Sequence, residues 1–271
     1  MSNATDRIRL ENIDMRFMTE RGELKVVEDV SLTIREGEFV AIVGPSGCGK
    51  TTLLNMMAGF IRPSGGNVLL DDKTKAGPGR DRGVMFQEYG VFPWLTVKEN
   101  IAFGLRLAAN KVDQEKRDEI CQRYMRLMRL TDFANSYPKT LSGGMRQRVA
   151  LARAYAVNPS FLLMDEPFGA LDAQTRSAMQ DLLLEVLASE NKTVVMITHS
   201  VDEALYLASR IVVISARPAR IRKIIDVPFG YPRQNDVQEL PEFSALRAEI
   251  KDLVMQEYAA QEQQARLRLS D

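Results

Sequence analysis

The stretch that decides the fold is an apolar run followed by a glycine-rich loop: Phe39-Val40-Ala41-Ile42-Val43, then Gly44-Pro45-Ser46-Gly47-Cys48-Gly49-Lys50-Thr51. The apolar run predicts a buried strand. Residues Thr51 to Ala58 predict a helix that ends at Gly59. The loop between them fits the spacing G-x-x-x-x-G-K-[ST], and its place between a strand and a helix is the context that this pattern requires.

This spacing predicts a phosphate-binding loop. Glycines allow the backbone to curl until its N–H groups face the phosphates, and the following helix adds its positive N-terminal end. We expect Lys50 to reach the β- and γ-phosphates, the Thr51 hydroxyl to bind Mg²⁺, and Thr52 to contact the α-phosphate. The alternative is a glycine turn that meets the pattern by chance.

An acidic pair ends a second apolar run, Phe161-Leu162-Leu163-Met164-Asp165-Glu166. Parallel strands carry ligands at their C-terminal ends. We therefore expect Asp165 to bind Mg²⁺, directly or through water, and Glu166 to orient or deprotonate an attacking water. The alternative is an ordinary solvated turn.

Strands and helices alternate along the chain, which predicts an α/β fold with a mainly parallel sheet. Further strands are predicted at 30–34, 67–70, 84–86, 193–197 and 211–214. Residues 97 to 158 are helical in pattern and look like an insertion in the sheet domain. From Phe243 onward, apolar residues on one helical face predict an amphipathic tail helix.

The segment Leu141-Ser142-Gly143-Gly144-Met145 resembles the LSGGQ signature of ABC ATPases. The order of the motifs along the chain also matches, and the resemblance covers about residues 8 to 220. Within that family the chain resembles the ATPases of nitrate, sulfonate and taurine importers. The segments 77–83, 92–97 and 241–243 carry this narrower likeness.

The resemblance implies a P-loop core, an N-terminal antiparallel β part, and an inserted helical sub-domain at about 88–158. It places an ATPase domain at 1–240 and a tail at 241–271. It also implies a head-to-tail dimer with an identical or a different ATPase subunit. In such a dimer Ser142, Gly143, Gly144 and Asp172 contact the partner's ATP. Met145 replaces the usual Gln, so we expect altered affinity without loss of activity. An ordinary Ser N-cap is the alternative for the signature.

Three further residues lie where the family places nucleotide contacts. His199, the single histidine, follows a predicted strand at the position of the γ-phosphate sensor. Gln87 follows another strand, and its amide oxygen suits Mg²⁺ and water. Phe17 stands where an aromatic stacks on adenine, a contact worth ~1–3 kcal/mol. The alternatives are a structural histidine, a surface glutamine and a core phenylalanine.

An aromatic run follows Gln87 and consists of Tyr89, Val91, Phe92, Pro93 and Trp94. Aromatic residues are enriched at interface hot spots. The resemblance implies that this region and the helical insertion receive a short helix from a transmembrane permease subunit. The alternative is sub-domain core.

Composition limits the remaining classes of function. The formal net charge is +0, which argues against a general nucleic-acid binder. Neither a secretory signal nor a membrane-spanning run is visible, and two cysteines form no disulfide framework. The family resemblance implies a peripheral protein at the cytoplasmic face of the membrane.

We therefore predict a MgATP-hydrolysing subunit of an importer, which drives the uptake of a small anionic solute through a separate permease and meets a solute-binding protein only indirectly. The alternative is a soluble ABC-type ATPase outside transport.

Cys48 lies among backbone N–H groups, beside Lys50. We expect its thiol to have a lowered pKa and to react readily, with a buried and inert thiol as the alternative.

Overall fold

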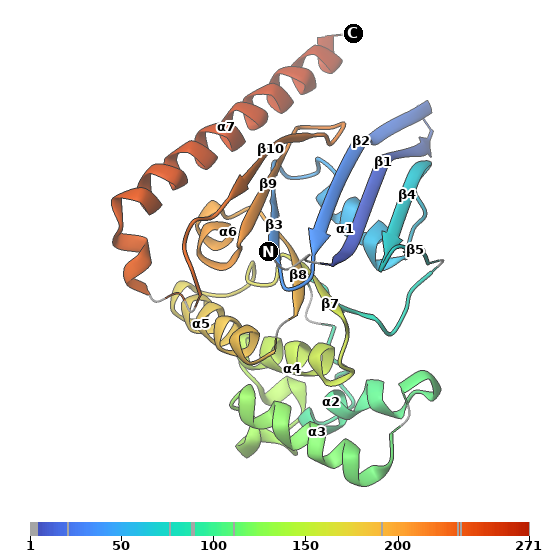
Figure 1. The fold of residues 1–271 in the computed structure, drawn as a ribbon, viewed down its shortest axis with the longest axis vertical. Helices are drawn as coiled ribbons and strands as arrows, with labels where there is room; N and C mark the ends of the chain where they lie inside the picture. Colours follow the sequence, from blue (N-terminus) through green and yellow to red (C-terminus); the bar gives the residue numbers. More distant parts are fainter. Residues whose placement is uncertain are drawn as a thin grey trace. The chain divides into compact units, whose positions relative to one another are not determined.

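The computed structural model describes residues 5–20, 22–75, 77–87, 90–110, 112–190, 192–231, 233 and 235–270. The side chains of 109, 235, 264–265 and 267–270 are excepted. The chain divides into two compact units (Figure 1). Unit 1 comprises Met1–Pro78 and Thr193–Asp271, and unit 2 comprises Gly79–Lys192. The prediction of a domain boundary at residue 240 stays a prediction.

One sheet of unit 1 is antiparallel, with the strand order β2-β1-β4-β5. Its strands are β1 (Asp6–Thr19), β2 (Gly22–Arg35), β4 (Gly65–Leu70) and β5 (Lys73–Thr74). Ile8, Leu10 and Ile13 are buried on one face of β1, as expected for strand residues that pack against a core. The N-terminal antiparallel part implied by the resemblance is therefore confirmed.

The second sheet of unit 1 is mainly parallel and holds the strands β10-β9-β3-β8 in that order. β3 (Phe39–Val43) pairs in parallel with β8 (Thr193–Thr198) and with β9 (Arg210–Ile214). Every residue of β3 and β8 is buried, which explains their continuous apolar sequence. The edge strand β10 (Ile221–Asp226) runs antiparallel to β9 and was not predicted, because its exposed charged residues hide the strand pattern.

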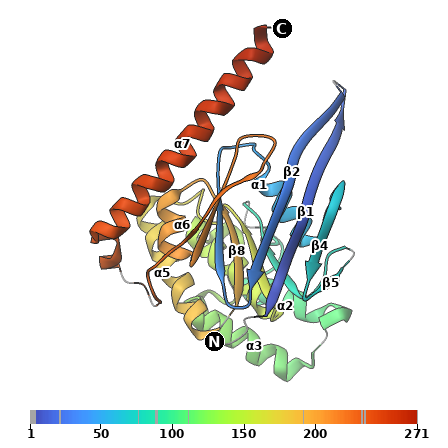
Figure 2. The ribbon, with the colours of Figure 1, turned by 45° about the horizontal axis from the view of Figure 1, so that its top comes forward.

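Unit 1 also contains the helices α1 (Lys50–Ala58), α6 (Val201–Leu207), η4 (Asn235–Glu239) and α7 (Pro241–Ser270). α1 contacts both β2 and β8, and α7 packs against α6 and β9 (Figures 1 and 2). Gly59 caps α1 in the left-handed conformation, as the sequence predicted.

Unit 2 combines a parallel strand pair with a group of helices. The pair is β6 (Arg82–Met85) with β7 (Phe161–Asp165). Between them lie α2 (Val97–Arg106), η1 (Ala108–Asn110), α3 (Gln114–Leu127), η2 (Thr131–Phe133), η3 (Pro138–Thr140) and α4 (Gly143–Ala156), and α5 (Ala173–Ser189) follows β7. The predicted helical insertion is therefore present, divided into separate short helices.

The short strand β5 was not among the predicted strands. Lys73 and Thr74 form it by pairing with β4. A two-residue strand is too short to produce an alternating pattern. None of the helices among the described residues is both long enough and apolar enough to cross a bilayer.

Candidate active site

The glycine-rich loop of unit 1 connects β3 to α1, and its lysine is turned inward. Lys50 is 6% exposed, and its ammonium donates hydrogen bonds to the carbonyl oxygens of Gly44 and Pro45, each at 2.7 Å. A buried ammonium needs such acceptors, because an unpaired charge in the interior is costly. The Lys50 ammonium is thus bound to carbonyl oxygens of its own loop. It would have to exchange these acceptors for phosphate oxygens in order to contact a phosphate.

The N-terminus of α1 has no capping side chain. Its N-cap residue is Gly49, with a φ of 125° and no side-chain cap hydrogen bond. A β-carbon at this position would also meet the carbonyl oxygen of Val26 at 3.1 Å, so glycine is required on both counts. Uncapped N–H groups together with the helix dipole favour an anion at this end.

The two threonines after the lysine differ in exposure: Thr51 is exposed and Thr52 is half-buried. Their predicted contacts with Mg²⁺ and the α-phosphate stay predictions. Among the described residues, no three acidic, histidine or cysteine side chains gather as a metal site. Hydroxyl, amide and carboxylate oxygens are nevertheless the ligands that Mg²⁺ prefers, so the predicted set of Thr51, Gln87 and Asp165 is chemically suitable.

The prediction of a reactive Cys48 was wrong. The thiol is fully buried, and burial raises its pKa above the ordinary value. The positive charges of Lys50 and Arg217 act in the opposite direction, but desolvation is the larger effect. The sequence prediction gave the nearby charges more weight than burial, whereas the alternative of a buried thiol agrees with the structure. Cys121 is also buried, and burial raises its pKa as well.

Two other predicted residues of unit 1 are exposed. Phe17, on β1, is 38% exposed, so it is not a core phenylalanine. His199 follows β8 and is exposed, and Ser200 after it caps α6 by accepting a hydrogen bond from the backbone N–H of Glu203. The turn that presents the histidine is tied down, since the backbone N–H of Ser200 donates to the Thr198 hydroxyl at 3.0 Å.

In unit 2 the acidic pair ends β7, and the two carboxylates differ in environment. Asp165 is buried at the strand end, whereas Glu166 is half-buried and has a φ of 45°. The left-handed conformation is uncommon for a residue other than glycine. It reverses the chain at this point, so the two consecutive side chains need not follow the alternation of a strand.

The structure brings Gln87 and Glu166 together within unit 2. The Gln87 amide Nε2 donates to Glu166 Oε2 at 3.4 Å, across 79 positions of sequence. Because the nitrogen is directed to the carboxylate, the amide oxygen can serve a cation or water on another side. This pair is the clearest side-chain juxtaposition among the predicted catalytic residues.

The signature segment begins α4. The Ser142 side chain accepts a hydrogen bond from the backbone N–H of Met145 at 3.3 Å, so Ser142 is an N-cap. Ser142 is exposed, whereas Gly144 is buried against α5, where a β-carbon would lie 2.5 Å from Thr175. The alternative reading as a cap is thus correct in geometry, and it does not exclude a further contact with a ligand.

Asp172 is the N-cap of α5, and its carboxylate accepts from the backbone N–H of Thr175 at 2.9 Å. This hydrogen bond from the Thr175 backbone is the main cause of a lowered pKa at Asp172. The residue is exposed. Its predicted role at a partner's nucleotide stays a prediction.

Sequence reasoning missed Gln147, which is 1% exposed in the middle of α4. Its amide Nε2 donates to the carbonyl oxygen of Pro167, the residue after Glu166. The signature helix is therefore tied to the turn that carries the predicted base. The available signal was a glutamine on the helix face that packs against the protein interior, because buried amides need specific hydrogen-bond partners.

The aromatic run lies on a loop before α2. Trp94 is 69% exposed, and Phe92 stacks between it and Phe103, with ring centroids at 5.5 and 4.5 Å. The guanidinium of Arg153 lies 4.9 Å from the Phe92 ring. Val91 is half-buried and Pro93 exposed, while Tyr89 lies outside the described residues. Pro93 and Trp94 are therefore exposed and Phe92 is half-buried, and the role of this run as a partner surface stays a prediction.

A buried side chain, Asn100, holds this loop in place. Its amide oxygen accepts from the backbone N–H of Phe92 at 2.8 Å, and its nitrogen donates to the carbonyl oxygens of Phe92, Leu95 and Thr96 at 3.0–3.1 Å. All of its hydrogen-bonding capacity is used within one loop. Nothing in the sequence pattern identified this residue.

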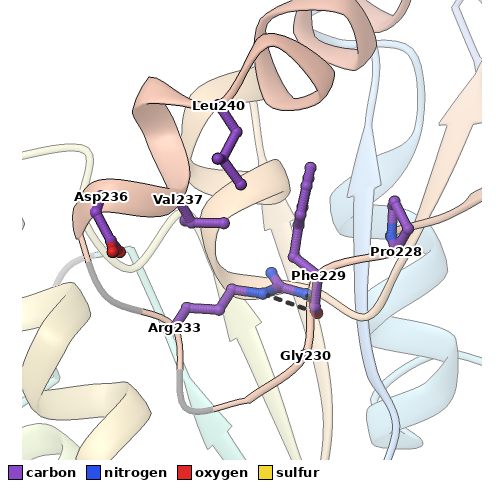
Figure 3. A pocket seen from close by; sticks show the side chains of 7 residues that line it. All are labelled: Pro228, Phe229, Gly230, Arg233, Asp236, Val237 and Leu240. Carbon is purple, nitrogen blue, oxygen red and sulfur yellow. Dashed lines mark hydrogen bonds between the residues drawn. The ribbon is translucent and has the colours of Figure 1, made fainter.

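A separate hollow of about 430 Å³ lies in unit 1 (Figure 3). It is lined by Pro228, Phe229, Gly230, Arg233, Asp236, Val237 and Leu240. The Arg233 guanidinium is buried and donates to the carbonyl oxygens of Leu205, Tyr206 and Phe229. Since its donors are directed to backbone, this arginine supports the C-terminal end of α6.

Comparison with known proteins agrees with this geometry. The family model described as ABC transporter matches residues 27–169. The chain is 40% identical over 257 residues to the nitrate import ATP-binding protein of Synechococcus elongatus, covering 94% of each chain. It is 44% identical over 249 residues to the taurine import ATP-binding protein of Pelagibacter ubique, covering 90% of this chain and 93% of that one.

A solved structure with a similar fold is the dimeric post-hydrolysis state of an ATP-binding cassette bound to ADP and Pi. The TM-score is 0.71 at 31% identity, with 82% of this chain and all of that chain covered. The predicted α/β cassette fold is therefore confirmed.

Proposed function

Because the chain belongs to the ABC transporter family and is an ATPase of that family, we propose that it powers an importer. Its ATP-driven closure would be coupled to uptake of a small anionic solute through a separate permease. The relatives that import nitrate and taurine support an oxyanion, either a nitrate or a sulfonate, as the solute class. The subunit would lie peripherally at the cytoplasmic face of the membrane.

The proposed chemistry divides the site between binding and hydrolysis. The loop Gly44–Thr51 would hold the phosphates of ATP, with Lys50 exchanging its two carbonyl partners for phosphate oxygens. Mg²⁺, when bound by oxygens of Thr51, Gln87 and Asp165, supplies charge neutralisation at the phosphates. Glu166 would orient and deprotonate water, and His199 would contact the γ-phosphate. Phe17, an exposed aromatic, offers a face for the adenine ring.

We further propose that two ATPase subunits pack head to tail, as copies or as related chains. Ser142, Gly143, Gly144 and Asp172 of one subunit would then contact the nucleotide of the other. Exposed helix N-termini at Ser142 and Asp172 support this arrangement, because such ends attract anions.

The observation that carries the transport proposal is the exposed aromatic loop held by Asn100. Exposed tryptophan on a fixed backbone is typical of a protein interaction site. The proposed occupant is a short helix of the permease, and a solute-binding protein would act on the far side of that permease. A soluble ABC-type ATPase outside transport would have no need of this surface.

The experiment is co-purification of the chain with a candidate permease subunit, in wild-type form and as Trp94→Ala. We expect Trp94→Ala to lower recovery of the complex and solute-stimulated ATPase activity, while the isolated subunit binds ATP normally. Phe133→Ala, which removes an aromatic that is 40% exposed in the same unit, is the control. Full assembly and transport with Trp94→Ala would contradict the assignment of this surface.

A panel of solutes then tests the solute class. Nitrate, taurine and an alkanesulfonate are compared with a neutral sugar and a cationic amino acid, each with the reconstituted complex. Stimulation of ATPase activity by the anions alone is the expected result. Stimulation by the sugar or the cation would contradict the proposal.

A further inference from the structure

The inward face of α7 changes character along its length. In the first half, Phe243, Ile250 and Val254 are buried against the rest of unit 1. One and two turns later the same face presents Glu257, 7% exposed, and Gln261, half-buried. Figures 1 and 2 show α7 as one continuous helix that begins beside α6. A purely packing role would favour apolar residues throughout.

Glu257 fixes α7 to the turn between β9 and β10. Its carboxylate accepts from the backbone N–H of Ala216 at 3.0 Å and pairs with the Arg222 guanidinium at 2.6 Å. A buried carboxylate that accepts from a backbone N–H and pairs with a guanidinium is a specific anchor, because a buried charge needs partners. The register of α7 on this turn is therefore set.

The same turn packs directly against the glycine-rich loop. A β-carbon on Gly44 would meet Ile214 at 2.8 Å, and one on Gly49 would meet the β-carbon of Ala219 at 3.3 Å. The loop, the β9–β10 turn and the second half of α7 thus form one packed arrangement. A helix in fixed register on the turn is also in fixed register on the loop.

Gln261 completes this arrangement with a direct contact. Its amide Nε2 donates to the carbonyl oxygen of Ser46 at 3.1 Å, 215 positions earlier in the chain. Its Oε1 is buried and has no hydrogen-bond partner among the described residues. A buried oxygen without a partner costs free energy. An apolar residue of the same length would avoid that cost, so the amide is poorly suited to packing and well suited to donating to Ser46.

The consequence for the loop follows from peptide geometry. In a planar trans peptide the C=O and the N–H point in opposite directions. A donor that holds the Ser46 carbonyl therefore directs the N–H of Gly47 to the other side of the loop. Gly47 has a φ of 71°, a conformation open to glycine in which this peptide could otherwise rotate readily.

We propose that Gln261 is a positioning residue for nucleotide binding, which orients the Ser46–Gly47 peptide so that the Gly47 N–H faces a phosphate. This inference rests on the proposed role of Gly44–Thr51 as the ATP phosphate loop. Backbone N–H groups in such loops contact the α- and β-phosphates. ATP and ADP carry both, so the affinity for each should depend on Gln261, whereas turnover at saturating ATP should not.

The test uses the full purified chain with Gln261→Met and Gln261→Glu, and Gln263→Met as the matched control on the exposed side of the same helix. Methionine keeps the length and removes the donor, while glutamate also places a negative charge beside the loop. The measurements are the Kd for ATP and ADP, kcat at saturating ATP, and the Tm of the protein without nucleotide.

We expect Gln261→Met to weaken ATP and ADP binding about 3- to 10-fold, as loss of one hydrogen bond predicts, and Gln261→Glu to weaken it further. The kcat should stay near wild type. The Tm of Gln261→Met should equal or exceed that of wild type, because Ser46 is exposed and its carbonyl can take water instead. Gln263→Met should leave every value unchanged.

The outcomes distinguish failure of the proposed phosphate loop from failure of the proposed role of Gln261. If Lys50→Ala still binds ATP, the proposed phosphate loop fails and the inference fails with it. If Lys50→Ala loses ATP while Gln261→Met and Gln261→Glu bind as wild type, only the inference is overturned. A lowered Tm with unchanged Kd would assign Gln261 to packing alone and would also overturn it.

Discussion

The N-termini of α1 and α4 both meet a glycine-rich segment, yet they are built in opposite ways. α1 begins after Gly49 with no capping side chain, and its Lys50 is buried against the loop. α4 begins after Ser142, whose exposed side chain caps the Met145 N–H. The N-terminus of α1 thus lacks a capping side chain, and the N-terminus of α4 has one.

This difference bears on which end we propose to bind a nucleotide within one chain. A helix N-terminus without a capping side chain, followed by a lysine that donates to the loop carbonyls, suits the binding of phosphate. A capped, exposed end has less to gain from an anion and needs one delivered by another molecule. The comparison therefore supports the proposed division in which α1 binds ATP first and α4 closes over the partner's ATP.

The largest effect is expected for a residue that lies at neither helix N-terminus and is proposed to act in hydrolysis itself. Glu166→Gln keeps the size of the side chain and removes the base, so we expect hydrolysis to fall by ~10²–10⁴-fold. Loss of one negative charge near the γ-phosphate should also favour the closed pair of subunits. Size-exclusion chromatography with MgATP should show a dimer. A monomer with near wild-type turnover would contradict the role of Glu166.

Lys50→Ala tests the N-terminus of α1. It removes two potential charge-assisted hydrogen bonds to phosphate, and we expect ATP affinity to fall by about 10²-fold. Equilibrium binding of ATP to the isolated subunit is the measurement, with the exposed Lys73→Ala as control. His199→Ala should bind ATP almost normally and hydrolyse it poorly. Equal loss of binding in Lys50→Ala and His199→Ala would remove the distinction between them.

Two substitutions of Ser142 test the N-terminus of α4. Ser142→Ala removes the cap, so we expect a stability loss of about 0.5–2 kcal/mol with unchanged ATP affinity of the isolated subunit. Ser142→Asp keeps a good cap and should retain the wild-type Tm, but its charge would face the partner's phosphate. ATPase activity lost in Ser142→Asp despite an unchanged Tm is the expected result. Full activity there would show that Ser142 is a cap and nothing more.

The smallest effect is expected at Met145, where the signature departs from the family pattern. Met145→Gln adds a polar side chain and leaves the backbone N–H in place. We expect less than about a threefold change in the ATP dependence of turnover, within the range of one weak hydrogen bond. Steady-state ATPase assays over a range of ATP concentrations provide the test. A change above tenfold would mean that the side chain at 145 governs closure.

Local features of the fold were predictable from sequence, because each is decided by neighbouring residues. The strand Phe39–Val43 was predicted with its observed bounds, and Gly59 was placed correctly as the helix end. The edge strand β10 was missed, since its pairing with β9 and not its own pattern makes it a strand. Local pattern contains no information about such a partner.

The site divides in the same way. The place of Gln87 and Glu166 after strands could be predicted, because an apolar run precedes each of them. Cys48 was misjudged, because its burial depends on elements far along the chain. Gln261 and Asn100 could not be found at all, since a single amide has no sequence signature until the fold supplies its partner.

The four hydrogen bonds of Asn100 have an energetic consequence for any partner that docks on Phe92 and Trp94. A loop that must become ordered on binding loses conformational entropy at that moment, and the affinity falls accordingly. Here the order is already established within the free subunit. The aromatic surface is therefore rigid before contact, and a movement of the permease helix would be transmitted to α2 rather than absorbed by the loop.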